Sequence, residues 1–175
     1  MKVLDLFCGA GGLSLGFRNE GFSVTGVDVN DWAGEIYLIN DIGEFIQKDL
    51  AIESIDGSYE VIVGGPPCRP WSSVNVKRRG FFHPDYSLLE HFFAHILRIK
   101  PSVFLLENVP PLEGDIIYKN FKKTMYRAGY SISSKVINYQ DYGVATSRKR
   151  LFTVGFRDFN IFGFDANRFF EKLTC

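Results

Sequence analysis

The stretch Lys2-Val3-Leu4-Asp5-Leu6-Phe7-Cys8-Gly9-Ala10-Gly11-Gly12 carries the first evidence of the fold class. Its apolar run from Val3 to Phe7 predicts a buried strand, and the glycines after it permit a tight turn and close approach of a ligand. A helical pattern begins at Gly12, and the amino end of a helix offers free backbone N–H groups. A strand, a glycine-rich turn and a helix in this order are shared by nucleotide-binding α/β folds.

The same alternation continues along the chain. Further strands are predicted over 23–29, 45–47, 61–63, 103–106, 132–138 and 151–156, and helices over 12–20, 32–40, 86–99 and 116–128. Strands that alternate with helices imply a mostly parallel sheet with helices on both faces. We therefore expect an α/β fold, with residues 1–175 forming a single domain.

Composition excludes several classes of protein. The 175 residues carry no formal net charge, so any nucleic-acid contact must come from a local basic patch. The cysteines Cys8, Cys68 and Cys175 are odd in number and lack metal-type spacing, which argues against a disulfide scaffold or a metal site. The N-terminus does not resemble a signal peptide, and no apolar run reaches the roughly 20 residues of a membrane span. These features predict a cytoplasmic protein without a membrane partner.

The segment Gly64-Gly65-Pro66-Pro67-Cys68 presents one cysteine on a stiff, narrow backbone. It follows the buried strand at 61–63, and active sites of open α/β sheets lie at the carboxyl ends of strands. The prolines fix their own φ angles, and the glycines allow a flat ligand to approach. A lone cysteine is more often a structural core residue, so Cys68 is a candidate nucleophile because of its neighbours.

The next strand ends in Glu107. A right-handed crossover makes consecutive parallel strands near neighbours, so we expect the Cys68 thiol and the Glu107 carboxyl to face one crevice. A buried glutamate without a partner costs several kcal/mol, which favours a function for it. Arg148 and Arg150 are two positions apart on an extended segment, so both can point inward. The alternative for these arginines is a salt-bridged strand edge.

Two acidic residues indicate a nucleotide-like cofactor. Asp28 ends the second predicted strand at the spacing from the glycine turn at which an acid receives ribose hydroxyls. Asp49 follows the short third strand, where a carboxylate can meet an adenine amino group. Dehydrogenases and methyltransferases share this geometry, and a helix-capping or surface role is the alternative for each residue.

Residues 75–85 are basic and aromatic and predict an exposed, mobile loop downstream of Cys68. Lys77, Arg78 and Arg79 could meet an anionic substrate, in which case the loop acts as a lid. Taken alone, the same segment favours a solvated charged loop over a lid.

In order and spacing, four motifs resemble those of DNA (cytosine-5)-methyltransferases. They are Asp5-Leu6-Phe7-Cys8-Gly9-Ala10-Gly11-Gly12, Pro67-Cys68, Glu107-Asn108-Val109, and Tyr142-Gly143-Val144 with Arg148 and Arg150. The resemblance covers residues 3 to about 156 and implies a Rossmann-like, S-adenosylmethionine-dependent methyltransferase fold. It implies that S-adenosylmethionine binds at Phe7, Gly9, Gly11, Asp28, Val29, Asp49, Leu50, Gly65 and Pro67.

The resemblance also implies a duplex DNA partner whose target cytosine is flipped out of the stack. Cys68 would attack cytosine C6, Glu107 would hydrogen-bond ring N3, and Arg148 and Arg150 would favour the thiolate or hold the flipped nucleotide. The loop after Cys68 would close over DNA through Arg69, Ser72, Lys77, Arg78 and Arg79.

The sequence departs from the family pattern in three places. Arg69 stands where the family commonly carries glutamine, and Ala145-Thr146-Ser147 replaces a run containing Pro-Gln. Family members continue with a target-recognition region and a further cofactor-side motif, whereas residues 157–175 form a short aromatic tail. We therefore expect a truncated catalytic domain without target recognition, which is completed by a second polypeptide or by self-association.

Three alternatives stay open at this point. The substrate could be an RNA cytosine, or the chain could be a non-catalytic subunit or remnant that binds S-adenosylmethionine. A nicotinamide-dependent dehydrogenase would explain the glycine turn and Asp28, but it would give Cys68 and Glu107 no role.

Overall fold

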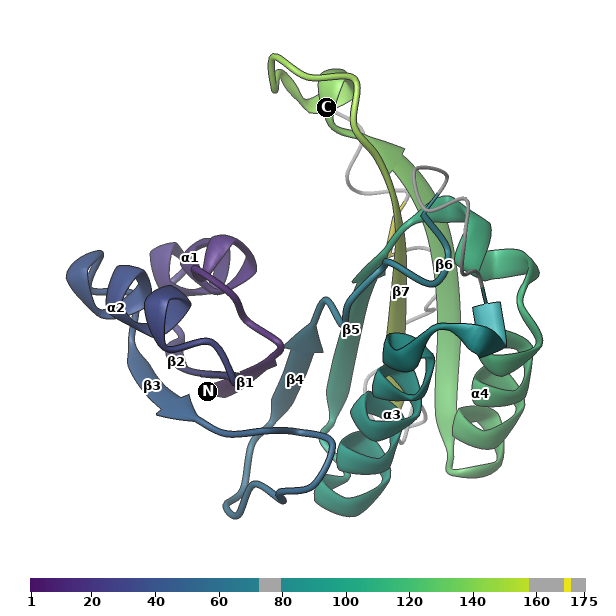
Figure 1. Cartoon of the computed structure of the whole chain (residues 1–175), viewed down its shortest axis with the longest axis horizontal. Coiled ribbons are helices and arrows are strands. Elements are labelled where there is room, and N and C mark those ends of the chain that lie inside the picture. Colours follow the sequence, from purple (N-terminus) through teal and green to yellow (C-terminus); the bar gives the residue numbers. More distant parts are fainter. Residues whose placement is uncertain (73–79, 158–168, 171–175) are drawn as a thin grey trace.

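The fold is seen in a computed structural model that describes residues 1–72, 80–157 and 169–170. These residues form a seven-stranded sheet in the order β3-β2-β1-β4-β5-β7-β6 (Figure 1). The strands are β1 (Lys2–Leu6), β2 (Ser23–Asp28), β3 (Glu44–Gln47), β4 (Val61–Gly64), β5 (Val103–Asn108), β6 (Tyr130–Asn138) and β7 (Lys149–Arg157). The α-helices are α1 (Gly12–Asn19), α2 (Asp31–Ile39), α3 (Leu88–Ile99) and α4 (Ile116–Arg127).

The prediction of a mostly parallel α/β sheet is confirmed. Strands β3, β2, β1, β4 and β5 are parallel neighbours. At the other edge β7 runs antiparallel to both β5 and β6. Residues 139–148 join β6 to β7 without a crossover helix, which is compatible with antiparallel neighbours, whereas parallel neighbours need a longer crossover. Antiparallel pairing brings the start of β7 beside the end of β5, which places Arg150 close to Glu107.

Alternate side chains of β1 face opposite layers of the core, as the period of a strand requires. Val3 belongs to a cluster against which Leu13 and Phe17 of α1 pack, whereas Leu4 and Leu6 belong to the large cluster that contains α3 and α4. Helix α2 lies on the same side as α1, with Tyr37 packed among Cys8, Ile42 and Phe45. Figure 1 shows both helix pairs, and helices therefore cover both faces of the sheet.

The prediction of an exposed, mobile loop over 75–85 needs correction for residues 80–85, which the structure describes. Residues 80–82 and 84–87 form two short 3₁₀ helices, and the ring nitrogen Nδ1 of His83 accepts a hydrogen bond from the Asp85 N–H group. These turns occupy the first residues of the helix predicted over 86–99, so α3 begins at Leu88. Asp85 and Tyr86 are half-buried, although Phe81 and Phe82 are exposed. Lys77, Arg78 and Arg79 lie outside the described residues.

Most of the aromatic tail also lies outside the described residues. Phe170 is buried, and the Phe169 ring packs against Phe156 of β7 with 5.8 Å between ring centroids. Of these two tail residues, Phe169 thus contacts the sheet, and the Phe170 side chain is shielded from solvent. Across the described ranges, no helix combines the length and the apolar character that a bilayer crossing requires.

Candidate active site

A cavity of about 440 Å³ opens at the carboxyl ends of the parallel strands. Its volume lies within the range of sites for small organic ligands. It brings together most of the residues predicted to bind a cofactor, with four that were not predicted: Lys48, Ala51, Asp85 and Leu88. The full lining is Phe7, Asp28, Val29, Lys48, Asp49, Leu50, Ala51, Gly65, Pro67, Arg69, Asp85 and Leu88. We call it the nucleotide cavity.

Asp28 is fixed at this cavity by two backbone N–H groups. Its Oδ2 atom accepts a hydrogen bond from the Gly9 N–H at 2.9 Å, and its Oδ1 atom accepts one from the Asn30 N–H at 2.9 Å. The carboxylate thus ties the glycine turn after β1 to the start of α2. A carboxylate has about four lone-pair sites, so Asp28 keeps the capacity to accept hydrogen bonds from ligand hydroxyls.

Gly9 and Gly11 serve the turn in different ways. Gly9 acts through its N–H group on Asp28, and neither glycine lines the nucleotide cavity. Gly11 is buried and has a φ of 87°. A Cβ atom at Gly11 would lie 2.5 Å from Ile42 Cδ1 and 2.7 Å from a Tyr37 ring carbon. Gly11 therefore allows α2 to pack against the turn.

Asp49 stabilises the loop that forms one wall of the nucleotide cavity. Its Oδ1 atom accepts a hydrogen bond from the Ala51 N–H at 2.9 Å, and its own N–H donates to Glu53 Oε1 at 3.0 Å. Lys48 precedes Asp49 directly and could have been inferred from that adjacency. Asp85 reaches the cavity from a distant turn, and no spacing in the sequence indicates it.

A second cavity of about 420 Å³ adjoins the nucleotide cavity and shares Phe7 and Gly65 with it. It is lined by Asp5, Phe7, Cys8, Gly12, Leu13, Gly65, Glu107, Tyr139, Arg148 and Phe152. Tyr139 and Phe152 were not predicted, because they come from the antiparallel edge of the sheet. Tyr139 lines this cavity, whereas Tyr142, which belongs to the motif Tyr142-Gly143-Val144, is exposed. We call it the acidic cavity, after Asp5 and Glu107.

Glu107 lies in β5 and forms an ion pair with Arg150, with 2.8 Å between Glu107 Oε1 and Arg150 Nε. Burial raises the pKa of the Glu107 carboxyl, and the opposing effect of Arg150 and Arg148 does not cancel the rise. Because the charged form is disfavoured by desolvation, this carboxyl is suited to donating a hydrogen bond or a proton.

The three basic residues at the start of β7 alternate as expected for an extended chain. Arg150 is half-buried against Glu107, and Lys149 is exposed. Arg148 lines the acidic cavity, although much of its side chain is exposed. Burial, and then the negative charge of Glu107, raises the pKa of Tyr139 on the opposite wall.

Cys68 is half-buried in a turn that other elements hold in place. The Pro66 carbonyl accepts a hydrogen bond from Asn108 Nδ2 at 3.0 Å, and the Cys68 carbonyl accepts one from the Trp71 N–H at 3.0 Å. A Cβ atom at Gly65 would lie only 3.2 Å from Glu107 Oε2, so the absent side chain leaves room for the carboxyl.

The structure forms two adjoining cavities at this edge, and the single crevice expected for Cys68 and Glu107 stays a prediction. Glu107 lines the acidic cavity, and Pro67 and Arg69 line the nucleotide cavity, but Cys68 is not among the described residues that line either one. The reason is that the strand ends at Gly64 and the proline turn carries Cys68 past the strand end. Arg69 forms an ion pair with Asp85 at 2.6 Å, and Ser72 is half-buried beside the turn.

Asp5 is a buried acid in the wall of the acidic cavity. Burial raises its pKa to about 7, although the Ser14 hydroxyl donates a hydrogen bond to its Oδ2 atom at 2.6 Å. Within the described part of the chain, its Oδ1 atom has no hydrogen-bond partner. A buried oxygen of this kind normally has a partner, and a polar or cationic ligand group in the cavity could supply it.

A model of the C-5 cytosine-specific DNA methylase family matches residues 1–173. The chain is 38% identical to the type II methyltransferase M.FnuDI of Fusobacterium nucleatum, a match that covers 94% of this chain and 50% of that protein. It is 36% identical to the type II methyltransferase M.NgoPII of Neisseria gonorrhoeae, over 90% of this chain and 48% of that protein. The chain thus spans about half the length of these relatives.

Solved structures have the same fold. The Entamoeba histolytica methyltransferase EhMeth superposes with a TM-score of 0.73 at 23% identity, covering 89% of this chain and 52% of that one. The Dnmt2 methyltransferase of S. pombe superposes with a TM-score of 0.74 at 20% identity, covering 98% of this chain and 55% of that one.

Proposed function

The chain belongs to the C-5 cytosine-specific DNA methylase family, and from that premise we propose that it transfers a methyl group from S-adenosylmethionine to carbon 5 of cytosine in DNA. One observation carries the proposal. Glu107 is a half-buried carboxyl with a raised pKa, and Arg150 forms an ion pair with it. Its Oε2 atom lies 3.2 Å from the position that a Cβ atom of Gly65 would take, at the base of the turn that carries Cys68. A dehydrogenase would have no use for this arrangement.

The two cavities fit the proposed cofactor. Asp28 is fixed where it can accept ribose hydroxyls, and Asp49 lies in the wall where an adenine amino group would sit. Phe7 lines both cavities and offers an aromatic ring to a cationic group. Asp5 Oδ1, which has no hydrogen-bond partner among the described residues, can accept a hydrogen bond from the ammonium group of S-adenosylmethionine. When bound, S-adenosylmethionine supplies an electrophilic methyl group.

Cytosine C5 is a weak nucleophile, so the ring must be activated before it can accept a methyl group. In the proposed reaction the Cys68 thiolate adds to C6, and the displaced electron pair is accepted at N3 as Glu107 gives it a proton. C5 then takes the methyl group, and the electron pair of the broken sulfur–methyl bond would stay on the thioether product, S-adenosylhomocysteine. Loss of the C5 proton to a base restores the C5–C6 double bond, the C6–S bond breaks, and the N3 proton returns to Glu107.

The arginines have separate proposed tasks. Arg150 contacts Glu107 directly, so it orients the carboxyl and limits the rise in its pKa. Arg148 lies at the open wall of the acidic cavity, where its guanidinium can contact the flipped nucleotide.

The substrate is proposed to be duplex DNA, which meets the loop at Arg69, Ser72, Lys77, Arg78 and Arg79. Residues 1–175 would then be a catalytic methyltransferase domain. Since the chain spans about half the length of its curated relatives, we propose that target recognition comes from polypeptide outside residues 1–175, of which a second chain or another copy is one source. Both relatives are type II methyltransferases, which supports a role in restriction–modification.

The test is transfer of a labelled methyl group to duplex DNA, with single-stranded RNA as the competing substrate and nucleoside analysis of the product. We expect 5-methylcytosine from DNA, no transfer by Cys68→Ala, and wild-type transfer by the matched thiol deletion Cys175→Ala. Glu107→Gln should lose less activity than Cys68→Ala, because an amide can donate to N3 but cannot pass a proton. Transfer to RNA alone would replace the proposed substrate. Cofactor binding without transfer to either substrate, both with and without a co-encoded neighbour, would favour a binding subunit.

A further inference from the structure

The two ends of the segment that follows Cys68 are fastened to each other. The Arg69 guanidinium forms an ion pair with Asp85 at 2.6 Å, and the Gly80 N–H donates to the Pro70 carbonyl at 2.8 Å. The rings of Trp71 and Tyr86 also pack together, with 5.6 Å between centroids. We call this set, Arg69, Pro70, Trp71, Gly80, Asp85 and Tyr86, the neck. The basic run Lys77-Arg78-Arg79 lies between its two sides in the sequence.

One carboxylate, Asp115, holds both sides of the neck. Trp71 Nε1 donates to Asp115 Oδ2 at 2.8 Å, and the Tyr86 hydroxyl donates to Asp115 Oδ1 at 2.6 Å. Burial opposes ionisation of this carboxyl, but the hydrogen bonds from Tyr86, Ile117 and Trp71 outweigh it and lower the pKa of Asp115. Asp115 is therefore ionised at neutral pH, and hydrogen bonds to a charged acceptor are stronger than neutral ones.

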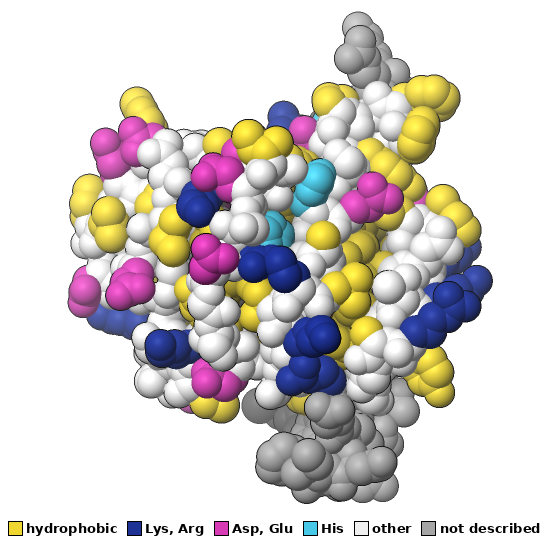
Figure 2. Space-filling model, turned by 90° about the horizontal axis from the view of Figure 1, so that it is seen from below, with side chains coloured by type: hydrophobic (Ala, Val, Ile, Leu, Met, Phe, Trp, Pro, Cys, Tyr) yellow, Lys and Arg dark blue, Asp and Glu magenta, His cyan; other side chains and the backbone are white. Residues whose placement is uncertain are grey.

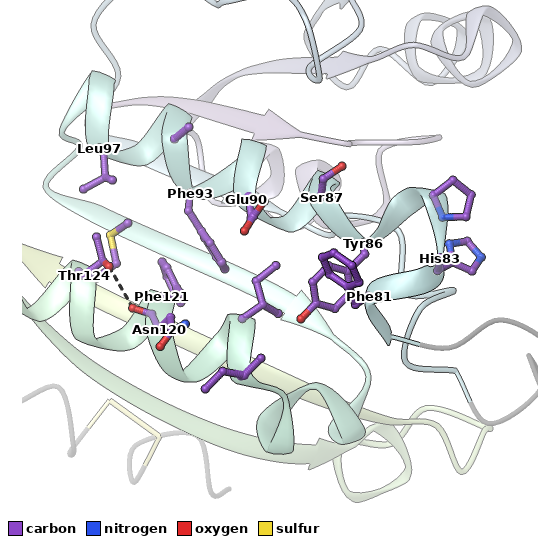
Figure 3. Close-up of a pocket in the computed structure, with 15 residues that line it drawn as sticks. Phe81, His83, Tyr86, Ser87, Glu90, Phe93, Leu97, Asn120, Phe121 and Thr124 are labelled. Carbon is purple, nitrogen blue, oxygen red and sulfur yellow. Dashed lines mark hydrogen bonds between the residues drawn. The ribbon is translucent and has the colours of Figure 1, made fainter.

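The neck lies at one end of a groove between α3 and α4. Figure 2 shows apolar side chains gathered in a strip to the right of its centre, in the region where Figure 1 places α3 and α4. In Figure 3, Phe81 and Tyr86 lie together at one end of this groove, and their ring centroids are 5.9 Å apart. The neck is thus packed on the α3 and α4 layer as well as hydrogen-bonded to it.

The neck is connected to the proposed nucleophile through the backbone. The Trp71 N–H donates to the Cys68 carbonyl, so a shift of Trp71 moves the turn that carries the thiol. Arg69 and Asp85 line the nucleotide cavity, so the same contacts form part of its wall. Asp115 itself lines neither cavity.

We propose that Asp115 is a positioning residue for methyl transfer. Its hydrogen bonds hold the neck together, and the neck in turn fixes the Cys68 turn and both ends of the segment that follows Cys68. This role rests on the proposed function, because it concerns the reaction of Cys68 with cytosine. Positioning a nucleophile within about 1 Å matters, since a misplacement of that size can cost roughly a hundredfold in rate.

A purely structural role for Asp115 is the alternative, because its Oδ1 atom also caps α4 by accepting a hydrogen bond from the Ile117 N–H at 3.0 Å. Two variants separate the roles. Tyr86→Phe removes one neck contact and leaves the helix cap intact. Asp115→Ser keeps a capping hydroxyl but is too short to hold the neck. Tyr118→Phe is the matched control, since it deletes a buried hydroxyl in α4 that bonds Thr153 and Ser134 away from the neck.

The experiment measures the single-turnover rate of covalent adduct formation on duplex DNA containing 5-fluorocytosine, together with the melting temperature. For Tyr86→Phe and Asp115→Ser we expect the rate to fall about tenfold or more, at temperatures where each variant is folded. Tyr118→Phe should lose stability and keep the rate. Equal rates in the neck variants and Tyr118→Phe would overturn the proposal and leave Asp115 as a helix cap.

A second measurement distinguishes failure of this inference from failure of the proposed function. The alkylation rate of Cys68 by iodoacetamide, followed by mass spectrometry, requires no methyl transfer. Asp115→Ser should raise this rate about threefold or more, because the turn opens locally, and Tyr118→Phe should leave it unchanged. If the wild type neither methylates nor forms an adduct, alone or together with the polypeptide that supplies target recognition, the proposed function fails. In that case an unchanged alkylation rate in Asp115→Ser overturns the clamp as well.

Discussion

Truncation of Asn108 should loosen the turn that carries Cys68, and the cost can be worked from two hydrogen bonds. Asn108 is fully buried, donates to the Pro66 carbonyl at 3.0 Å and accepts from the Val109 N–H at 2.9 Å. Asn108→Ala leaves both backbone groups without a partner. Each such buried group costs about 1–3 kcal/mol, and water entering the vacated space recovers part of it. We expect a loss of about 3 kcal/mol in the free energy of unfolding.

Urea denaturation followed by circular dichroism measures this loss, and an unchanged m-value would show that the unfolded state is not affected. Asn120→Ala is the matched control, because Asn120 is exposed on α4 and should change stability by less than about 0.5 kcal/mol. Asn108→Asp keeps the acceptor for Val109 but places a carboxylate against the Pro66 carbonyl, and it should regain stability as acid protonates it. A loss below about 0.5 kcal/mol in Asn108→Ala would refute the role of Asn108 as the support of the turn.

Three further predictions concern the cavities. The stability of Glu107→Gln relative to the wild type should rise with pH, because burial raises the pKa of Glu107 above its ordinary value of 4.5 and the wild type loses stability as pH rises through the raised pKa. An equal difference in the free energy of unfolding between the two proteins at acid and neutral pH would contradict this sign. Gly11→Ala should cost about 3 kcal/mol, because its φ is positive and a Cβ would overlap Ile42; a loss within error in urea denaturation argues against that packing. Asp28→Ala should weaken S-adenosylmethionine binding roughly tenfold to a hundredfold in calorimetry, and unchanged affinity would remove Asp28 from the site.

The strands β1, β2, β4 and β5 were predictable because each of them shows in a local pattern. Apolar β-branched runs and glycine turns are visible over a few residues, and parallel neighbours follow from the right-handed crossover rule. The antiparallel edge was not assigned, because residues 132–138 and 151–156 give no sign of their direction in the sheet. That edge delivers Tyr139 and Phe152 to the acidic cavity.

The start of α3 and the contacts of Asp115 were not predicted either, because they depend on segments that are far apart in the sequence. The predicted helix start at Tyr86 was too early, because His83 and Pro84 favour a 3₁₀ turn whose residues contribute to the neck. Asp115 shows only the features of a helix cap in the sequence. Its contacts with Trp71 and Tyr86 depend on the packing of α4 beside α3, and no local spacing indicates them.

The central claim is that Cys68 forms a covalent bond with cytosine, and mass spectrometry of the protein after incubation with S-adenosylmethionine and 5-fluorocytosine duplex DNA tests it most directly. Fluorine at C5 cannot leave as a proton, so the bond between sulfur and C6 should persist. We predict a DNA adduct on the peptide that contains Cys68, present in the wild type and in Cys175→Ala and absent in Cys68→Ala. Methylated DNA formed without any adduct, or an adduct that survives in Cys68→Ala, would contradict the account.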